Sequence, residues 1–143
     1  MSGVLKFNVD GSAVGKPGPA GIGGVLRDST AKVKGMFSVN IGTADSNYAE
    51  LRAVLEALDM YSTQNIIHGS HLIIESDSQN CVSWVNGEDS ACWKYANTLN
   101  QIQNLLRTIG LVSVVKIFRE ANGLADNLAK QGVYRSEAFR AFF

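Results

Sequence analysis

The hydrophobic pattern of the chain changes its period near residue 45, and this change limits the folds available to it. Residues 3–10 and 32–41 carry apolar side chains at alternate positions, which is typical of strands with one buried face. Between them, the glycine-rich segment 20–27 follows a turn rich in Gly and Pro. The three segments therefore predict an antiparallel meander of three strands.

Beyond residue 45 the apolar side chains recur at helical spacing or in short buried runs. Leu51, Val54, Leu55 and Leu58 fall on one face of a helix that begins at Asn47 and reaches about residue 61. The run 72–75 is typical of a buried parallel strand. The remaining segments are a short helix over 78–86, a helix over 95–109, a strand over 112–118 and a closing helix over 122–132.

This order predicts an α/β fold with a five-stranded mixed sheet, in which two parallel strands extend the three-strand meander and helices flank the sheet. A length of 143 residues predicts a single domain. The tail 133–143 holds three phenylalanines without a clear period. It either packs on the domain, pairs with another chain or is disordered.

Cys81 and Cys92 are too few for a disulfide scaffold and form no CxxC pair, which predicts free thiols in a reducing compartment. Neither a membrane-spanning apolar run nor a secretory leader is recognisable. We therefore expect an intracellular protein without a membrane segment, and cytosol, nucleus and organelle stay open. His68 and His71 flank Gly69 and are predicted to be surface loop residues.

Four acidic residues occupy positions at which a functional site is expected. Asp10 ends the first strand, where Gly11 is predicted to turn the chain away, and Asp77 follows the apolar run of the fourth strand. If these two strands are parallel neighbours, they end at the same edge of the sheet and the two carboxylates are adjacent. Such strand ends are where sites form in open α/β sheets. Glu50 and Asp126 lie near the beginnings of two helices.

Each acid also has an ordinary structural explanation. Asp10-Gly11 is a common turn pair, and Glu50 follows Asn47 at the spacing of a capping box. Asp77 and Asp126 suit the first turns of helices. Four converging carboxylates, however, repel one another, and Mg²⁺ or Mn²⁺ relieves that repulsion through oxygen ligands. Two such ions about 3.5–4 Å apart activate water and stabilise a leaving oxygen in phosphodiester cleavage.

The motifs around these acids resemble those of type 1 ribonuclease H, especially the plant and retroelement-like domains. The resemblance runs from about residue 4 to residue 133. The matching segments, in the family's order, are Asp10-Gly11-Ser12, Asn47-Tyr48-Ala49-Glu50-Leu51, Glu75-Ser76-Asp77-Ser78 and the stretch from Arg119 to Ala129. The resemblance implies a ribonuclease H-like fold. It also implies cleavage of the RNA strand of RNA/DNA hybrids by two metal ions, leaving 5′-phosphate and 3′-hydroxyl ends.

The resemblance also assigns roles to the acids. Asp10 bridges two metal ions, Glu50 and Asp77 complete the site that steadies the leaving 3′ oxygen, and Asp126 holds the metal that carries the attacking water. Further substrate contacts are implied for Gly11 and Ser12 through backbone groups at RNA 2′-hydroxyls. They are also implied for Asn47, for Asn122 and for Arg119. Helix capping is the alternative for both asparagines, and a surface charge is the alternative for Arg119.

Three departures from the family pattern keep a second function open. The loop before the last helix lacks the histidine of many relatives, and Arg119 is the candidate substitute. Only Lys94, beside Trp93, offers a positive charge where some relatives have a basic handle, and Trp84 is expected in the core. The formal net charge is zero, which predicts weak binding to a nucleic acid. The alternative is a catalytically weak or inactive module that binds nucleic acid or protein and is part of, or derived from, a larger protein.

Overall fold

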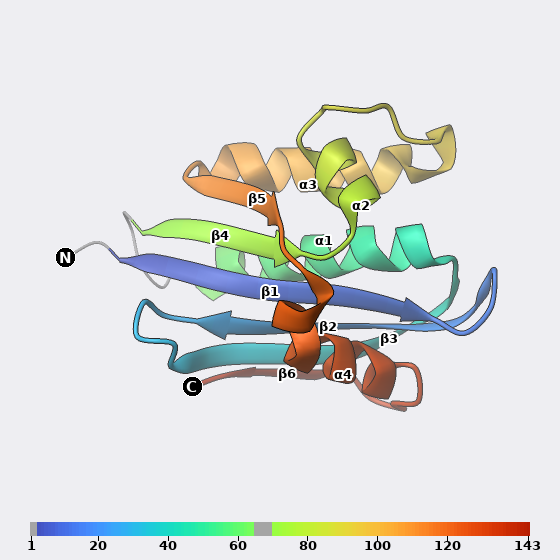
Figure 1. Cartoon of the computed structure of the whole chain (residues 1–143), viewed down its shortest axis with the longest axis horizontal. Coiled ribbons are helices and arrows are strands. Elements are labelled where there is room, and N and C mark those ends of the chain that lie inside the picture. Colours follow the sequence, from blue (N-terminus) through green and yellow to red (C-terminus); the bar gives the residue numbers. More distant parts are fainter. Residues whose placement is uncertain (1–2, 65–69) are drawn as a thin grey trace.

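The computed structural model describes residues 3–64 and 70–143, and these form a six-stranded mixed sheet with helices on both faces (Figure 1). The strand order is β5-β4-β1-β2-β3-β6. The strands are β1 (Val4–Ala13), β2 (Gly18–Arg27), β3 (Val33–Ala44), β4 (His71–Ser76), β5 (Val112–Lys116) and β6 (Phe139–Phe142). The helices are α1 (Ser46–Gln64), α2 (Gln79–Val85), α3 (Ala96–Ile109) and α4 (Gly123–Gly132), with short 3₁₀ turns η1 (Trp93–Tyr95) and η2 (Arg119–Asn122).

The predicted meander and the predicted parallel pairs are confirmed. β1, β2 and β3 pair antiparallel, whereas β4 pairs parallel with both β1 and β5. The prediction of five strands is wrong by one, because the tail adds β6 antiparallel to β3. A strand of four residues is too short to show a period in the sequence. Arg140 of β6 also donates from Nε to Glu56 Oε2 of α1 at 2.6 Å, which ties the tail to the helix.

The first strand does not end at Asp10, as the sequence predicted. Antiparallel pairing with β2 carries β1 on to Ala13, and Asp10 lies opposite Gly23. The turn rich in Gly and Pro that the sequence predicted before the second strand is therefore confined to residues 14–17, and a hydrogen bond of 2.8 Å from Val14 N to Pro19 O closes it. Parallel pairing of β1 with β4 does end at Val9 and Ser76, so Asp10 is the first residue beyond that ladder.

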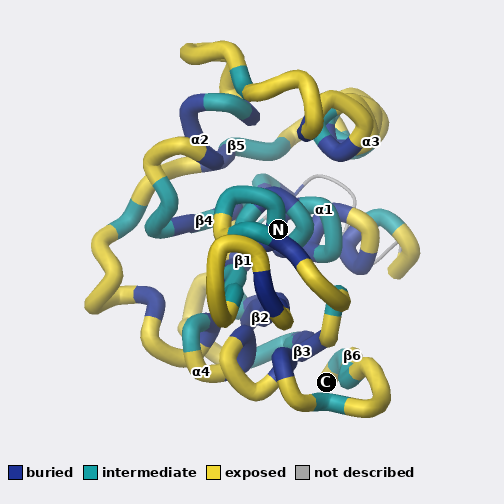
Figure 2. The backbone as a smooth tube through the Cα atoms, turned by 90° about the vertical axis from the view of Figure 1, so that its right-hand side faces the viewer, coloured by how far each residue is buried: buried dark blue, intermediate teal, exposed yellow. Residues whose placement is uncertain are grey.

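The two faces of the sheet are covered by different helices (Figures 1 and 2). Phe7 and Val9 point into the main core, where Leu51 and Leu58 of α1 meet them. On the other face α4 lies against β2, and a Cβ added at Gly23 would stand 2.4 Å from the backbone nitrogen of Ala129. The glycines of β2 thus let a helix approach the sheet to backbone contact.

The helix that carries Glu50 is capped by Asp45, not by Asn47 as the sequence predicted. The backbone N–H of Tyr48 donates to Asp45 Oδ1 at 2.7 Å, and Asn47 lies inside the first turn. Tyr95 donates its hydroxyl to the same carboxylate, and Lys94 Nζ lies 3.1 Å from its Oδ2 atom. The capping box that would have explained Glu50 therefore does not form.

We expect Asp45→Ala to lower the free energy of unfolding by about 1–2 kcal/mol, because the helix loses its cap and Tyr95 loses its acceptor. Urea unfolding followed by circular dichroism measures this change. Asp89→Ala, in an exposed loop, is the matched control and should change stability by less than about 0.5 kcal/mol. Equal midpoints for the two variants would show that Asp45 does not cap the helix.

The aromatic and histidine predictions have mixed outcomes. Trp84 packs against the core and stacks on Tyr95 at 5.4 Å between ring centroids, as predicted, whereas Trp93 is exposed. His71 is a strand residue, not a loop residue, and its Nε2 lies 2.7 Å from Ser113 Oγ. His68 and Gly69 lie outside the described residues. Among the described helices, none has both the length and the apolar character needed to cross a membrane.

Candidate active site

Three of the four predicted acids converge at the end of the β1–β4 ladder. Asp10 follows the last paired residue of β1, Asp77 follows β4, and Glu50 comes from α1. One carboxylate oxygen of each lies within 4.8 Å of the others. Side chains that are remote in sequence thus form one negatively charged cluster.

Gly11 brings α1 close enough for Glu50 to enter this cluster. A Cβ at Gly11 would stand 2.4 Å from the backbone carbon of Ala49, so a larger residue would push the helix away. The Gly11 N–H donates to Glu50 Oε1 at 2.6 Å and to Asp10 Oδ1 at 2.9 Å. This N–H is therefore already hydrogen-bonded within the cluster. The predicted contact with RNA 2′-hydroxyls would have to use the other backbone groups of Gly11 and Ser12, and it stays a prediction.

The cluster favours a bound proton or a cation. Burial raises the pKa of Asp10 from 3.8 to about 7, and the charges of Asp77 and Asp126 add to the rise, although a hydrogen bond with Glu50 opposes it. Burial and the charge of Asp10 likewise raise the pKa of Glu50 well above its ordinary value. Oxygen ligands at this spacing are a donor set that suits a hard divalent cation.

The same pKa shift predicts how stability depends on pH in a chelator. The folded protein holds a proton on Asp10 up to about pH 7, whereas the unfolded chain releases it near 3.8, so the folded state binds more protons in between. We expect this contribution to lower the melting temperature as pH rises from about 4 to 7. Differential scanning calorimetry in EDTA measures the slope. Asp10→Asn should flatten it, and an equal slope in the variant would contradict the assignment.

Asp126 and Arg119 lie at the rim of the cluster. Asp126 is in the first turn of α4, contributes a hydrogen bond and charge that raise the pKa of Asp10, and pairs with Lys130 at 2.9 Å. The guanidinium of Arg119 is largely exposed, and its Nε lies 3.8 Å from Asp77 Oδ2. Asp126 is thus adjacent to the cluster without joining the three-oxygen group, and Arg119 is a positive charge beside it.

Two asparagines fasten the segment that carries Arg119 to β1. Asn122 is only 1% exposed, and its Nδ2 donates to Val9 O at 2.9 Å. Asn8 Nδ2 donates to Asn122 Oδ1 at 3.3 Å and to Glu75 Oε1 at 3.1 Å. The side chain of Asn122 does not cap α4, so the capping alternative is wrong. Asn47 lies in the first turn of α1, and substrate contacts by both Asn47 and Asn122 stay predictions.

Sequence reasoning missed Asn8. The signal was present, since Asn8 alternates with Lys6 and Asp10 on one face of β1, yet its side chain is buried. A buried amide requires partners, and here they are Glu75 and Asn122 beside the acid cluster. Cys81 is also buried, and burial together with the charge of Glu50 raises the pKa of its thiol. The neutral thiol is therefore a packing group.

A mixed sheet of this order, with carboxylates gathered beyond two parallel strands, defines the class of ribonuclease H-like domains. The family model described as reverse transcriptase-like matches residues 8–132. An Arabidopsis thaliana protein with a provisional ribonuclease H name is 34% identical over 98% of this chain, and a ribonuclease H of Actinobacillus succinogenes is 31% identical over 90%. The chain belongs to the type 1 ribonuclease H family.

Solved structures agree with this assignment. The crystal structure of LC11-RNase H1 in complex with RNA/DNA hybrid has a TM-score of 0.86 and 26% identity, over 90% of this chain and 96% of that one. The matches differ in how much of the relative they cover. The alignment takes in 88% of the Actinobacillus protein but 22% of the Arabidopsis protein, so domains of this kind also occur within much longer chains.

Proposed function

We propose that this domain hydrolyses the RNA strand of RNA/DNA hybrids with the help of divalent metal ions. The observation that carries the proposal is the convergence of Asp10, Glu50 and Asp77, with oxygens within 4.8 Å of one another. A bound cation relieves the repulsion within such a cluster, and divalent cations are what two-metal phosphodiester hydrolysis uses. The relatives named above as ribonucleases H, and the hybrid bound to LC11-RNase H1, support this substrate.

The site residues divide into metal ligands and groups that position the substrate. Asp10, at the centre, would hold two Mg²⁺ or Mn²⁺ ions, with Glu50 and Asp77 on one and Asp126 on the other. When bound, such ions activate water and neutralise charge on the scissile phosphate and the leaving 3′ oxygen. Arg119 would steady the phosphate from the rim of the cluster.

The bond changes follow from this arrangement. A water oxygen attacks phosphorus, the bond from phosphorus to the 3′ oxygen breaks, and that oxygen takes up a proton. The products are a 5′-phosphate and a 3′-hydroxyl. A hybrid substrate would also need groups that recognise the 2′-hydroxyls, and Gly11, Ser12, Asn47 and Asn122 are the candidates.

A second candidate function is a weakly active or inactive module that binds nucleic acid or protein. Its support is specific: Arg119 stands 3.8 Å from Asp77 where many relatives have a histidine, and the chain has no net charge. The domain alone would then bind a hybrid weakly. In longer relatives, other parts of the chain would supply the missing affinity. An intracellular location stays a prediction for either function.

Cleavage of matched substrates separates the two functions. We would incubate the protein with an RNA/DNA hybrid, an RNA duplex and a DNA duplex of one sequence, each labelled on both strands, in Mg²⁺ and in EDTA. The proposal expects Mg²⁺-dependent cuts in the RNA strand of the hybrid alone. Binding to the hybrid without cleavage would favour the second function, and equal cleavage of all three duplexes would point to a less specific nuclease.

A further inference from the structure

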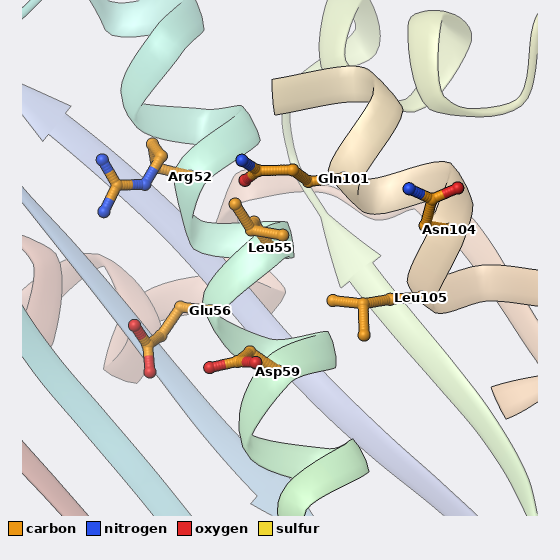
Figure 3. Close-up of a pocket in the computed structure, with 7 residues that line it drawn as sticks. All are labelled: Arg52, Leu55, Glu56, Asp59, Gln101, Asn104 and Leu105. Atoms are coloured by element: carbon orange, nitrogen blue, oxygen red, sulfur yellow. The ribbon is translucent and has the colours of Figure 1, made fainter. Parts of the chain in front are cut away.

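Several cavities lie outside the acid cluster in the described part of the chain, and two of them differ in the charges around them. The first, of about 430 Å³, lies between α1 and α3 (Figure 3). Two of its three charged side chains have partners in the chain, since Glu56 pairs with Arg140 and the Arg52 guanidinium lies 5.7 Å from the centre of the Tyr48 ring. Its third charged group, Asp59, is an acid and would repel a phosphate. The second, of about 400 Å³, lies on the sheet face that also carries Asp10. Its cations are less well paired.

Two cations face each other in the second cavity. The register of β1 and β2 places Lys6 directly opposite Arg27, and both side chains line the cavity. Like charges directly opposite each other across two strands destabilise a sheet. A favourable compensating group is therefore expected, and none is provided by Ser29 or the apolar residues that share the lining.

The nearby acids compensate these cations only in part. Glu75 Oε2 is 4.0 Å from Lys6 Nζ, and its other oxygen accepts from Asn8. Asp28 uses Oδ1 for the N–H and hydroxyl of Thr30 and the N–H of Lys32, which holds it in the β2–β3 turn.

Arg27 itself makes one long hydrogen bond, from Nη1 to Asn8 Oδ1 at 3.4 Å. Across residues 3–64 and 70–143, no carboxylate oxygen lies within 4.0 Å of its guanidinium. A half-buried guanidinium has five N–H donors in a planar fork that suits a phosphate. Most of those donors are left for a ligand in the cavity.

We propose that Lys6 and Arg27 form a phosphate-binding pocket for the backbone of the nucleic acid held at the acid cluster. This inference rests on the proposed function. Lys6 lies on the same face of β1 as Asp10 and four residues before it, a separation of about 13 Å. A strand that is bound at Asp10 can therefore reach Lys6 within a few nucleotides, since one strand advances about 3.4 Å along the helix axis per nucleotide. The η2 turn is fixed over Asn8 between the two sites, and its Arg119 is largely exposed.

The test uses a charge-removing pair and a matched pair on helices. Lys6→Gln with Arg27→Gln removes the pocket charges, whereas Arg52→Gln with Arg107→Gln removes two charges from α1 and α3. We expect the pocket variant to raise KM for an 18-base-pair hybrid by tenfold or more with kcat unchanged. The slope of log affinity against log salt should fall by about one to two. The control pair should leave KM and the salt slope close to wild type.

A titration with inorganic phosphate identifies the source of the ligand. NMR shifts at Asn8, Arg27 and Ser29 with phosphate alone would support a pocket that also takes the free ion, and an effect confined to the hybrid would support backbone binding only. Unchanged KM and salt slope in the pocket variant, with no phosphate shifts, would overturn the inference. If wild type binds hybrid without cleaving it and the pocket variant binds more weakly, the pocket stands and the proposed nuclease function fails.

Discussion

Asp10→Asn is expected to lower the rate of hybrid cleavage by about a thousandfold or more. The carboxylate of Asp10 is central to the cluster, since Gly11 N donates to it and the charges of Asp77 and Asp126 act on it. An amide of the same shape removes one ligand charge from a site whose chemistry depends on bound cations. Single-turnover cleavage of a labelled hybrid in Mg²⁺ measures the loss.

Unfolding will not explain that loss. Burial and like charges hold the pKa of Asp10 near 7, so replacing its carboxylate with a neutral amide relieves repulsion in the metal-free protein. We therefore expect the melting temperature of Asp10→Asn in EDTA at pH 8 to equal or exceed that of wild type. Asp59→Asn, on the exposed side of α1, is the matched control and should keep full activity. Equal cleavage by wild type and Asp10→Asn would exclude the proposed chemistry.

The sequence predicted the cluster because its residues lie where local patterns change. Asp77 follows an apolar run and Asp10 lies near the end of an alternating strand, so parallel pairing alone brings them together. Glu50 was less certain, since a capping box with Asn47 would have used it. Its position in the cluster requires that Asp45 caps the helix and that Gly11, without a side chain, lets the helix pack closely against β1. The close packing is a contact between segments that are distant in the sequence.

The features that the sequence did not reveal depend on tertiary contacts. β1 continues beyond Asp10 because its later residues still pair with β2, although Asp10-Gly11 is a common turn pair. β6 forms because β3 offers an open edge and Glu56 offers a partner to Arg140. Asn122 stands at the N-cap position of α4, yet its side chain donates a hydrogen bond to the carbonyl of Val9 instead of capping the helix. In each case a local preference yields to a partner that is remote in the chain.

The second large expected effect is a loss of stability when a glycine of β2 is replaced. We expect Gly23→Ala to lower the free energy of unfolding by about 3 kcal/mol, because the new methyl group would overlap the backbone of α4. Its carbon would stand 2.4 Å from Ala129 N and 2.6 Å from Ala125 O. Backbone atoms cannot rotate away as a side chain can, so the helix must move outward. Urea unfolding followed by circular dichroism measures the change.

Gly123→Ala is the matched control, because a Cβ there meets nothing within 4 Å. It begins α4 with an ordinary helical φ of −60°, so alanine should leave stability unchanged or raise it by up to about 1 kcal/mol. Outward movement of α4 in Gly23→Ala would also carry Asp126 away from Asp10 and lower hybrid cleavage, which the control should retain. If both variants unfold at the same urea concentration, α4 does not lie against β2 at backbone contact, and the placement of Asp126 beside the cluster is wrong.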